Sequence, residues 1–129
     1  MAMKWVLVID DDPAMVALLT DRLESAGCFV TSATDALQGL IQAETLSPVL
    51  VILDLVMPSF GGGVDVLKRI RKNPRLKNVP VIVLTGMPAE KARSLLPRND
   101  AKLRLLHKPP DWPLVLKTIQ EMLQVAQKT

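Results

Sequence analysis

Four short apolar segments of this chain each lead directly into polar residues, and this pattern restricts the fold more than any other feature. The segments are rich in Val, Ile and Leu and span residues 5–9, 49–53, 81–84 and 103–106. Such segments are typical of strands buried on both faces of a parallel sheet. The polar residues after them are, in order, Asp10 and Asp11, Asp54, Thr85, and His107 with Lys108. Because ligands bind beyond the carboxyl ends of parallel strands, these residues predict one shared site.

Predicted helices alternate with the strands along the chain. A fifth strand is expected at about 29–32, and helices at about 13–26, 35–45, 64–72, 88–96 and 112–126. Asp12 suits the N-cap of the first helix and Pro13 its first position. Five such units with short connections predict an α/β fold: a doubly wound, five-stranded parallel sheet. The strand order 2-1-3-4-5 would bring Asp10, Asp11 and Asp54 together, whereas the periodicity alone does not determine the order.

Bulk properties suggest one domain spanning residues 1–129, with a core over about 4–124. Of its residues, 49% are apolar, and no apolar run approaches the ~20 residues that span a bilayer. Neither a signal peptide nor a membrane contact is expected, and the single cysteine, Cys28, agrees with a reducing compartment. We therefore expect a cytoplasmic protein.

Basic residues gather in one stretch of a chain whose formal net charge is +3. The stretch contains Lys68, Arg69, Arg71, Lys72, Arg75 and Lys77. It includes no aromatic residue that could stack on bases, so it indicates the solvated face of a helix and the loop after it. We do not expect direct nucleic-acid binding.

The predicted site has the chemistry of a divalent cation and a phosphoryl group. Clustered carboxylates repel one another unless a cation compensates them, and hard oxygen ligands favour Mg²⁺. Asp54 is the best candidate for a nucleophile toward phosphorus, because it ends the central strand and opens a glycine-rich loop. Thr85, the N–H of Gly86 and the amine of Lys108 would bind the phosphoryl oxygens. Taken singly, each residue also suits a cap, a turn or a surface position, so the prediction depends on their coincidence.

The chain resembles the receiver domain of two-component response regulators. The matching segments are Val-Ile-Asp-Asp-Asp-Pro at 8–13, Leu-Asp-Leu-Val-Met-Pro at 53–58 followed by Gly62, Val-Leu-Thr-Gly at 83–86, and His-Lys-Pro at 107–109. The resemblance covers about residues 4–123. It implies a flavodoxin-like (βα)5 fold and a signalling role in a phosphorelay rather than an enzyme.

The resemblance also implies a role for each site residue. Asp54 would be phosphorylated by a histidine kinase or a histidine phosphotransfer protein, and the change would reach a downstream effector. Asp11, Asp54 and the backbone carbonyl of Val56 would bind Mg²⁺, with Asp10 acting through metal-bound water. The bond between Lys108 and Pro109 is often cis in this family.

Three positions depart from the family pattern. The residue three before the lysine is usually aromatic and moves on activation, but here it is Leu105. The positions that tune hydrolysis of the phosphoryl group are Val56 and Met87, and neither can orient a water molecule. Slow self-dephosphorylation is therefore expected.

Two other functions compete with the phosphoacceptor switch. A receiver-like interaction module that works without phosphate would tolerate Leu105 but leaves the acids unexplained. An aspartyl phosphatase usually needs a second acid two residues after the nucleophile, where this chain has Val56. A free-standing regulator and a receiver within a longer protein both remain open.

Overall fold

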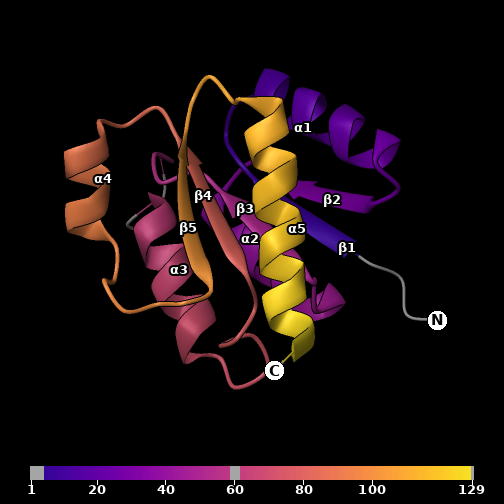
Figure 1. The fold of residues 1–129 in the computed structure, drawn as a ribbon. Coiled ribbons are helices and arrows are strands. Elements are labelled where there is room, and N and C mark those ends of the chain that lie inside the picture. Colours follow the sequence, from indigo (N-terminus) through magenta and orange to yellow (C-terminus); the bar gives the residue numbers. More distant parts are fainter. Residues whose placement is uncertain (1–4, 59–61, 129) are drawn as a thin grey trace.

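The computed structural model describes residues 5–58 and 62–128, in which five strands alternate with five helices (Figure 1). The strands are β1 (Trp5–Ile9), β2 (Phe29–Ala33), β3 (Leu50–Leu53), β4 (Val81–Thr85) and β5 (Leu103–His107). The helices are α1 (Pro13–Ser25), α2 (Ala36–Leu46), α3 (Gly62–Lys72), α4 (Ala89–Leu95) and α5 (Trp112–Lys128). None of these described helices has the length and apolar character needed to cross a bilayer.

The five strands form one parallel sheet in the order β2-β1-β3-β4-β5, which confirms the predicted doubly wound α/β fold. β1 and β3 are neighbours in the middle of the sheet, and Ile9 pairs with Leu53 at their carboxyl ends. The residues that follow these two, Asp10 and Asp54, therefore leave the sheet side by side.

Alternating side chains of the strands point to two separate apolar layers. One layer joins Val8 and Ile52 to Leu19 of α1 and Ile119 of α5. The other joins residues such as Leu53 to α2, α3 and α4, including Ile70 and Ala92. Both faces of β1, β3 and β4 are thus buried, as the apolar segments predict.

The prediction of burial on both faces is wrong for the segment 103–106. β5 lies at the edge of the sheet, where Arg104 is exposed and Leu103, Leu105 and Leu106 are only half-buried. The composition of a strand does not distinguish an edge from the centre, because that difference depends on which strand pairs beside it.

Local signals place most helix ends correctly. The carboxylate of Asp12 accepts a hydrogen bond from the N–H of Ala14 (3.0 Å) and caps α1 as predicted. α4 ends at Leu95, two residues before Pro97, which cannot continue a helix. α3 begins at Gly62, two residues earlier than predicted, because a pair of glycines packs against the chain after Asp54.

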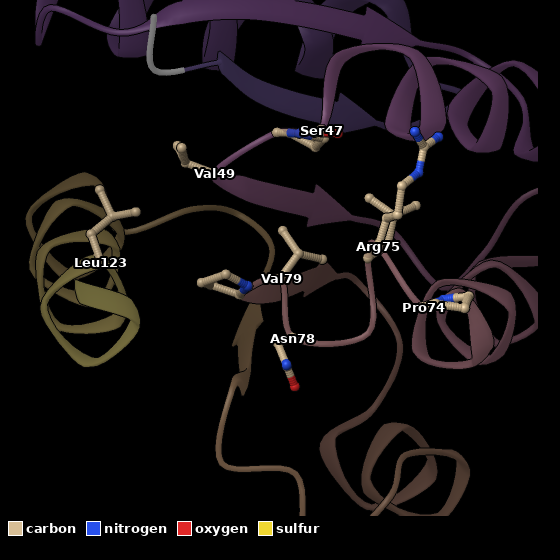
Figure 2. A pocket seen from close by; sticks show the side chains of 10 residues that line it. Ser47, Val49, Pro74, Arg75, Asn78, Val79 and Leu123 are labelled. Carbon is tan, nitrogen blue, oxygen red and sulfur yellow. The ribbon is translucent and has the colours of Figure 1, made fainter. Parts of the chain in front are cut away.

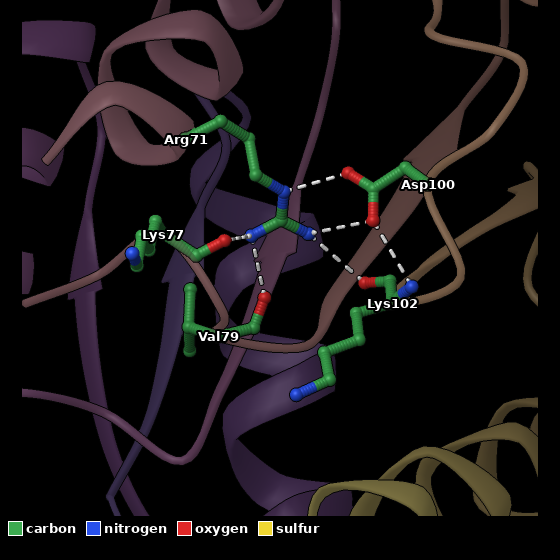
Figure 3. A network of polar contacts seen from close by, with 5 residues as sticks. All are labelled: Arg71, Lys77, Val79, Asp100 and Lys102. Atoms are coloured by element: carbon green, nitrogen blue, oxygen red, sulfur yellow. Dashed lines mark hydrogen bonds and ion pairs between the residues drawn. The ribbon is translucent and has the colours of Figure 1, made fainter. Parts of the chain in front are cut away.

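Arg71 is not a solvated side chain, contrary to the prediction for the basic stretch (Figure 3). Its guanidinium donates to Asp100 (2.6 and 3.4 Å) and to the carbonyl oxygens of Lys77, Val79 and Lys102 (3.3, 2.7 and 3.1 Å). Asp100 also accepts the N–H of Lys102 (3.0 Å). One side chain thereby ties the end of α3 to the loops that precede β4 and β5.

We expect Arg71→Ala to lower the free energy of unfolding by about 2–3 kcal/mol, because it removes the ion-pair partner of Asp100 and one hydrogen-bond donor from each of three carbonyl groups. The matched control is Arg69→Ala, which removes an exposed pair with Asp65 (3.1 Å) and should cost at most about 1 kcal/mol. Urea denaturation of both variants measures the difference. Equal losses would show that the Arg71 network does not stabilise the fold.

Candidate functional site

Three carboxylates meet at the carboxyl edge of the sheet. The N–H of Asp54 donates to the carbonyl of Ile9 (3.0 Å), which holds the ends of β1 and β3 together. One carboxylate oxygen from each of Asp10, Asp11 and Asp54 lies within 4.8 Å of the other two. Asp10 and Asp54 are 3% and 6% exposed, whereas Asp11 is open to solvent. The structure thus brings together the three acids that the strand-end pattern singled out.

Lys108 lies between two of these acids. Its Nζ is 2.8 Å from Oδ2 of Asp10 and 2.9 Å from Oδ2 of Asp54. Its backbone N–H donates to the carbonyl of Thr85 (2.9 Å), so the turn after β5 is fixed to the end of β4. The bond between Lys108 and Pro109 is cis, as the family resemblance implies. A single ammonium group therefore bridges carboxylates that come from β1 and β3.

Burial and neighbouring charges shift the pKa values of two groups in this cluster, Asp10 and Lys108. Burial raises the pKa of Asp10, and hydrogen bonds from Lys108 and from the N–H of Asp12 offset this only in part. Burial alone would lower the pKa of Lys108, but its hydrogen bonds to Asp10 and Asp54 outweigh that effect and raise it. Lys108 therefore stays charged while negative charge remains in excess around it.

The donor set fits a magnesium ion. It offers hard carboxylate oxygens, and one ammonium group compensates three acids. The carboxylate of Asp11 has no hydrogen-bond or ion-pair partner among residues 5–58 and 62–128. An exposed, unpaired carboxylate beside two buried ones leaves ligand positions open toward solvent.

The last residue of β4 and the residues after it lie at the same edge of the sheet. Thr85 is fully buried, and its Oγ1 accepts a hydrogen bond from the N–H of Met87 (3.2 Å). This bond uses a lone pair of the hydroxyl oxygen and leaves the hydroxyl proton unused. Apart from its chain neighbours, no atom of the described residues lies within 4 Å of the position that a Cβ would take on Gly86.

The three positions that depart from the family pattern lie in different surroundings. Val56 is 55% exposed, and its N–H donates to Oδ1 of Asp54 (3.2 Å). Met87 and Leu105 are half-buried against the core layer beneath α2, α3 and α4. Neither Val56 nor Met87 brings a polar side chain to Asp54.

Sequence reasoning assigned no role to Gly63, which shapes the site through its backbone. A Cβ on Gly63 would lie 2.0 Å from the carbonyl oxygen of Asp54 and 2.7 Å from Cα of Leu55. The N–H of Gly63 also donates to the carbonyl of Leu55 (2.9 Å). The run of three glycines at 61–63 was the available signal, but it does not show which glycine makes the close approach.

A cavity of about 330 Å³ lies at the opposite edge of the sheet and contains none of the predicted site residues (Figure 2). Val49 and Pro80, which precede β3 and β4, line it together with Arg75 and Leu123. Arg75 donates to the carbonyl of Glu44 (3.2 Å), which links the loop after α3 to α2. None of the described residues that line this cavity carries a carboxylate, so the acids at the carboxyl edge remain the candidate site.

Comparison with known proteins places the chain in a family. Residues 6–120 match the model of the response regulator receiver domain. The chain is 31% identical over 121 residues to the protein PilH of Pseudomonas aeruginosa, which covers 94% of this chain and 98% of PilH. The crystal structure of a CheY-like response regulator receiver domain protein from Methanospirillum hungatei superposes with a TM-score of 0.87 at 25% identity, over 98% of both chains.

Longer regulators are also similar. The chain is 40% identical over 85 residues to the DNA-binding dual master transcriptional regulator RpaA of Synechocystis, which covers 66% of this chain and 35% of RpaA. This chain therefore spans only about a third of that relative. It belongs to the response regulator receiver domain family, which is a family of signalling domains in two-component systems rather than of enzymes.

We expect Gly63→Ala to destabilise the protein by about 2 kcal/mol or more, because the added methyl group would overlap the Asp54 carbonyl. Gly86→Ala is the matched control and should change the free energy of unfolding by less than about 0.5 kcal/mol, since the same methyl group meets nothing within 4 Å. Thermal and urea denaturation measure both. Equal stabilities of the two variants would contradict the close approach at Gly63.

Proposed function

We infer that this protein is a phosphoacceptor switch of a two-component phosphorelay and that Asp54 accepts the phosphoryl group. The observation that carries this inference is the position of Lys108, whose ammonium group contacts Asp10 and Asp54 at 2.8 and 2.9 Å beside a third acid. Such a cluster suits phosphoryl transfer, in which positioning and charge compensation do most of the work. Membership of the receiver family supports the same function.

In this proposal a carboxylate oxygen of Asp54 attacks the phosphorus of a phosphohistidine on a histidine kinase or histidine phosphotransfer protein. The new O–P bond forms as the N–P bond breaks, and the imidazole nitrogen keeps the electron pair of the broken bond. Lys108 then loses one of its carboxylate partners and binds a phosphoryl oxygen instead. The hydroxyl of Thr85 and the N–H of Gly86 donate to the other oxygens.

We also propose that the site binds Mg²⁺. Asp11, Asp54 and the carbonyl of Val56 would hold the ion, with Asp10 acting through a bound water. Bound there, the ion neutralises charge on the phosphoryl oxygens. The unpaired carboxylate of Asp11 and the excess of acids over cations support this assignment.

Phosphorylation would act by changing a surface that a downstream effector recognises. The group adds about two negative charges and three acceptor oxygens, which is enough to bias loops between two arrangements. We place the protein in the cytoplasm, where a kinase would meet it, and propose no direct contact with nucleic acid.

We expect one phosphoryl adduct by intact-mass spectrometry after incubation with acetyl phosphate and Mg²⁺. Asp54→Asn should abolish the adduct, and chelation of Mg²⁺ should prevent it in the wild type. Asp35→Asn is the control, since Asp35 only caps α2 by accepting the N–H of Gln38 (2.8 Å), and it should be phosphorylated normally. An adduct on the Asp54→Asn protein would place the acceptor elsewhere.

The phosphoryl group on Asp54 should be long-lived, because Val56 and Met87 cannot orient an attacking water. We expect a half-life of minutes or longer at neutral pH once the donor is removed. Val56→Asn should shorten it by at least about threefold, since an amide can position water. Leu37→Asn replaces an equally exposed apolar side chain on α2 and should leave the half-life unchanged. Decay within seconds in the wild type would contradict the prediction.

A phosphate-independent interaction module is the second candidate. Leu105 supports it, because the aromatic residue that usually couples the site to the surface is missing and Leu105 packs half-buried against the core. Absence of both the adduct and any Mg²⁺-dependent stabilisation would favour this candidate over the switch.

A further inference from the structure

A groove with a volume of about 900 Å³ lies between α3 and the segment that connects α4 to β5. Its walls include Val64, Leu67 and Lys68 of α3, and Leu95 to Lys102 form the other side. Figure 1 shows α3 and α4 on the same side of the sheet, with the loop from α4 crossing α3 in this view before it enters β5. None of the residues assigned to the phosphoacceptor site lines this groove.

The groove is open because α4 is short. Pro97 ends the helix after Leu95, and the chain then runs as a loop to Lys102. The contacts of Arg71 with Asp100 and with the carbonyl of Lys102 hold this loop against the end of α3 (Figure 3). The wall of the groove is therefore held in place by hydrogen bonds within the chain.

Positive charge is concentrated along the groove. Among the described residues, six cationic side chains and one carboxylate line it, a formal excess of five, whereas the whole chain carries a net charge of +3. The single carboxylate, Asp100, is already paired with Arg71. Four of the cations are exposed and pair with no carboxylate in the described part of the chain; they are Lys68, Lys72, Lys77 and Arg98.

Apolar side chains accompany these charges. Leu95 is 41% exposed, Leu96 and Val64 are half-buried, and Ala101 is exposed. None of the described residues that line the groove is aromatic, so they offer the bases of a nucleic acid no stacking surface. A groove lined by both apolar and cationic side chains matches a peptide that carries both acidic and apolar side chains.

We propose that this groove binds an acidic segment of a protein partner, with its carboxylates on the lysines of α3 and its apolar side chains against Leu95 and Leu96. The groove lies beside Val79 and Lys102, which precede β4 and β5, at the edge of the sheet opposite Asp54. Binding therefore requires neither phosphate nor Asp54. The proposal does not depend on the phosphoacceptor function and can fail separately from it.

The test uses a fluorescein-labelled peptide of about ten residues in which pairs of Glu alternate with Leu. Fluorescence anisotropy with the full chain should show saturable binding that weakens with salt. The same protein labelled with ¹⁵N should show shift changes at Leu67, Leu96 and Ala101. Asp54→Asn should bind the peptide as the wild type does.

Charge reversal locates the binding surface. The double variant Lys68→Glu with Lys72→Glu should weaken binding at least about tenfold. Lys91→Glu with Lys117→Glu changes the net charge equally at exposed positions outside the groove and should bind within about twofold of the wild type. Circular dichroism checks that each variant is folded, and Lys72→Gln provides a milder change if the double variant is not.

Several results would overturn the proposal. One is the absence of saturable binding up to about 1 mM peptide. Equal binding of a peptide with Ser in place of Leu would reduce the effect to unspecific charge attraction. Tighter binding of a single-stranded oligonucleotide would assign the groove to nucleic acid. Equal weakening of peptide binding by both double variants would show that the peptide responds to net charge and not to the groove.

Discussion

The parallel pairing of β1 with β3 is the constraint on which the rest of the site depends. Ile9 pairs with Leu53, and the carbonyl of Ile9 accepts the N–H of Asp54 at 3.0 Å. The next residue of each strand is thereby held at one edge of the sheet, where Asp10 and Asp54 share the ammonium group of Lys108. A slip of one residue would turn one of these side chains to the other face of the sheet. The chemistry of the acids thus follows directly from strand register.

The site contains more negative than positive charge, and a bound cation would reduce this excess. Burial raises the pKa of Asp10, which means that the folded chain holds this carboxylate at a cost in stability above that pKa. Lys108 offsets part of the cost through its contacts with both acids, and its own pKa is raised by them. Asp11 adds a third carboxylate that no described residue pairs. Such an excess of clustered carboxylates is typical of a functional site rather than of a core.

The two edges of the sheet carry opposite charge. Acids crowd the carboxyl edge, whereas the basic groove lies between α3 and the loop before β5, near the amino ends of β4 and β5. Arg71 holds the loop before β5 in place, because its guanidinium binds Asp100 and three backbone carbonyls. Pro97 keeps α4 short, and Arg71 of α3 binds the loop that follows it. They give the molecule a second surface whose chemistry differs from that of the first.

The sequence by itself determined the alternation of strands and helices, the cap at Asp12 and the candidate acids, because each depends on neighbouring residues: short apolar runs, a capping carboxylate, a polar residue at a strand end. It did not reveal that β5 is half-exposed, that Arg71 is a structural side chain, or that Gly63 approaches the carbonyl of Asp54. Each of these depends on residues distant in sequence, such as 71 and 100, meeting after the sheet has assembled. Hydrophobic periodicity does not predict such contacts, because it shows which face of a helix or strand is apolar and not which residues that face will contact. Only the tertiary structure decided them.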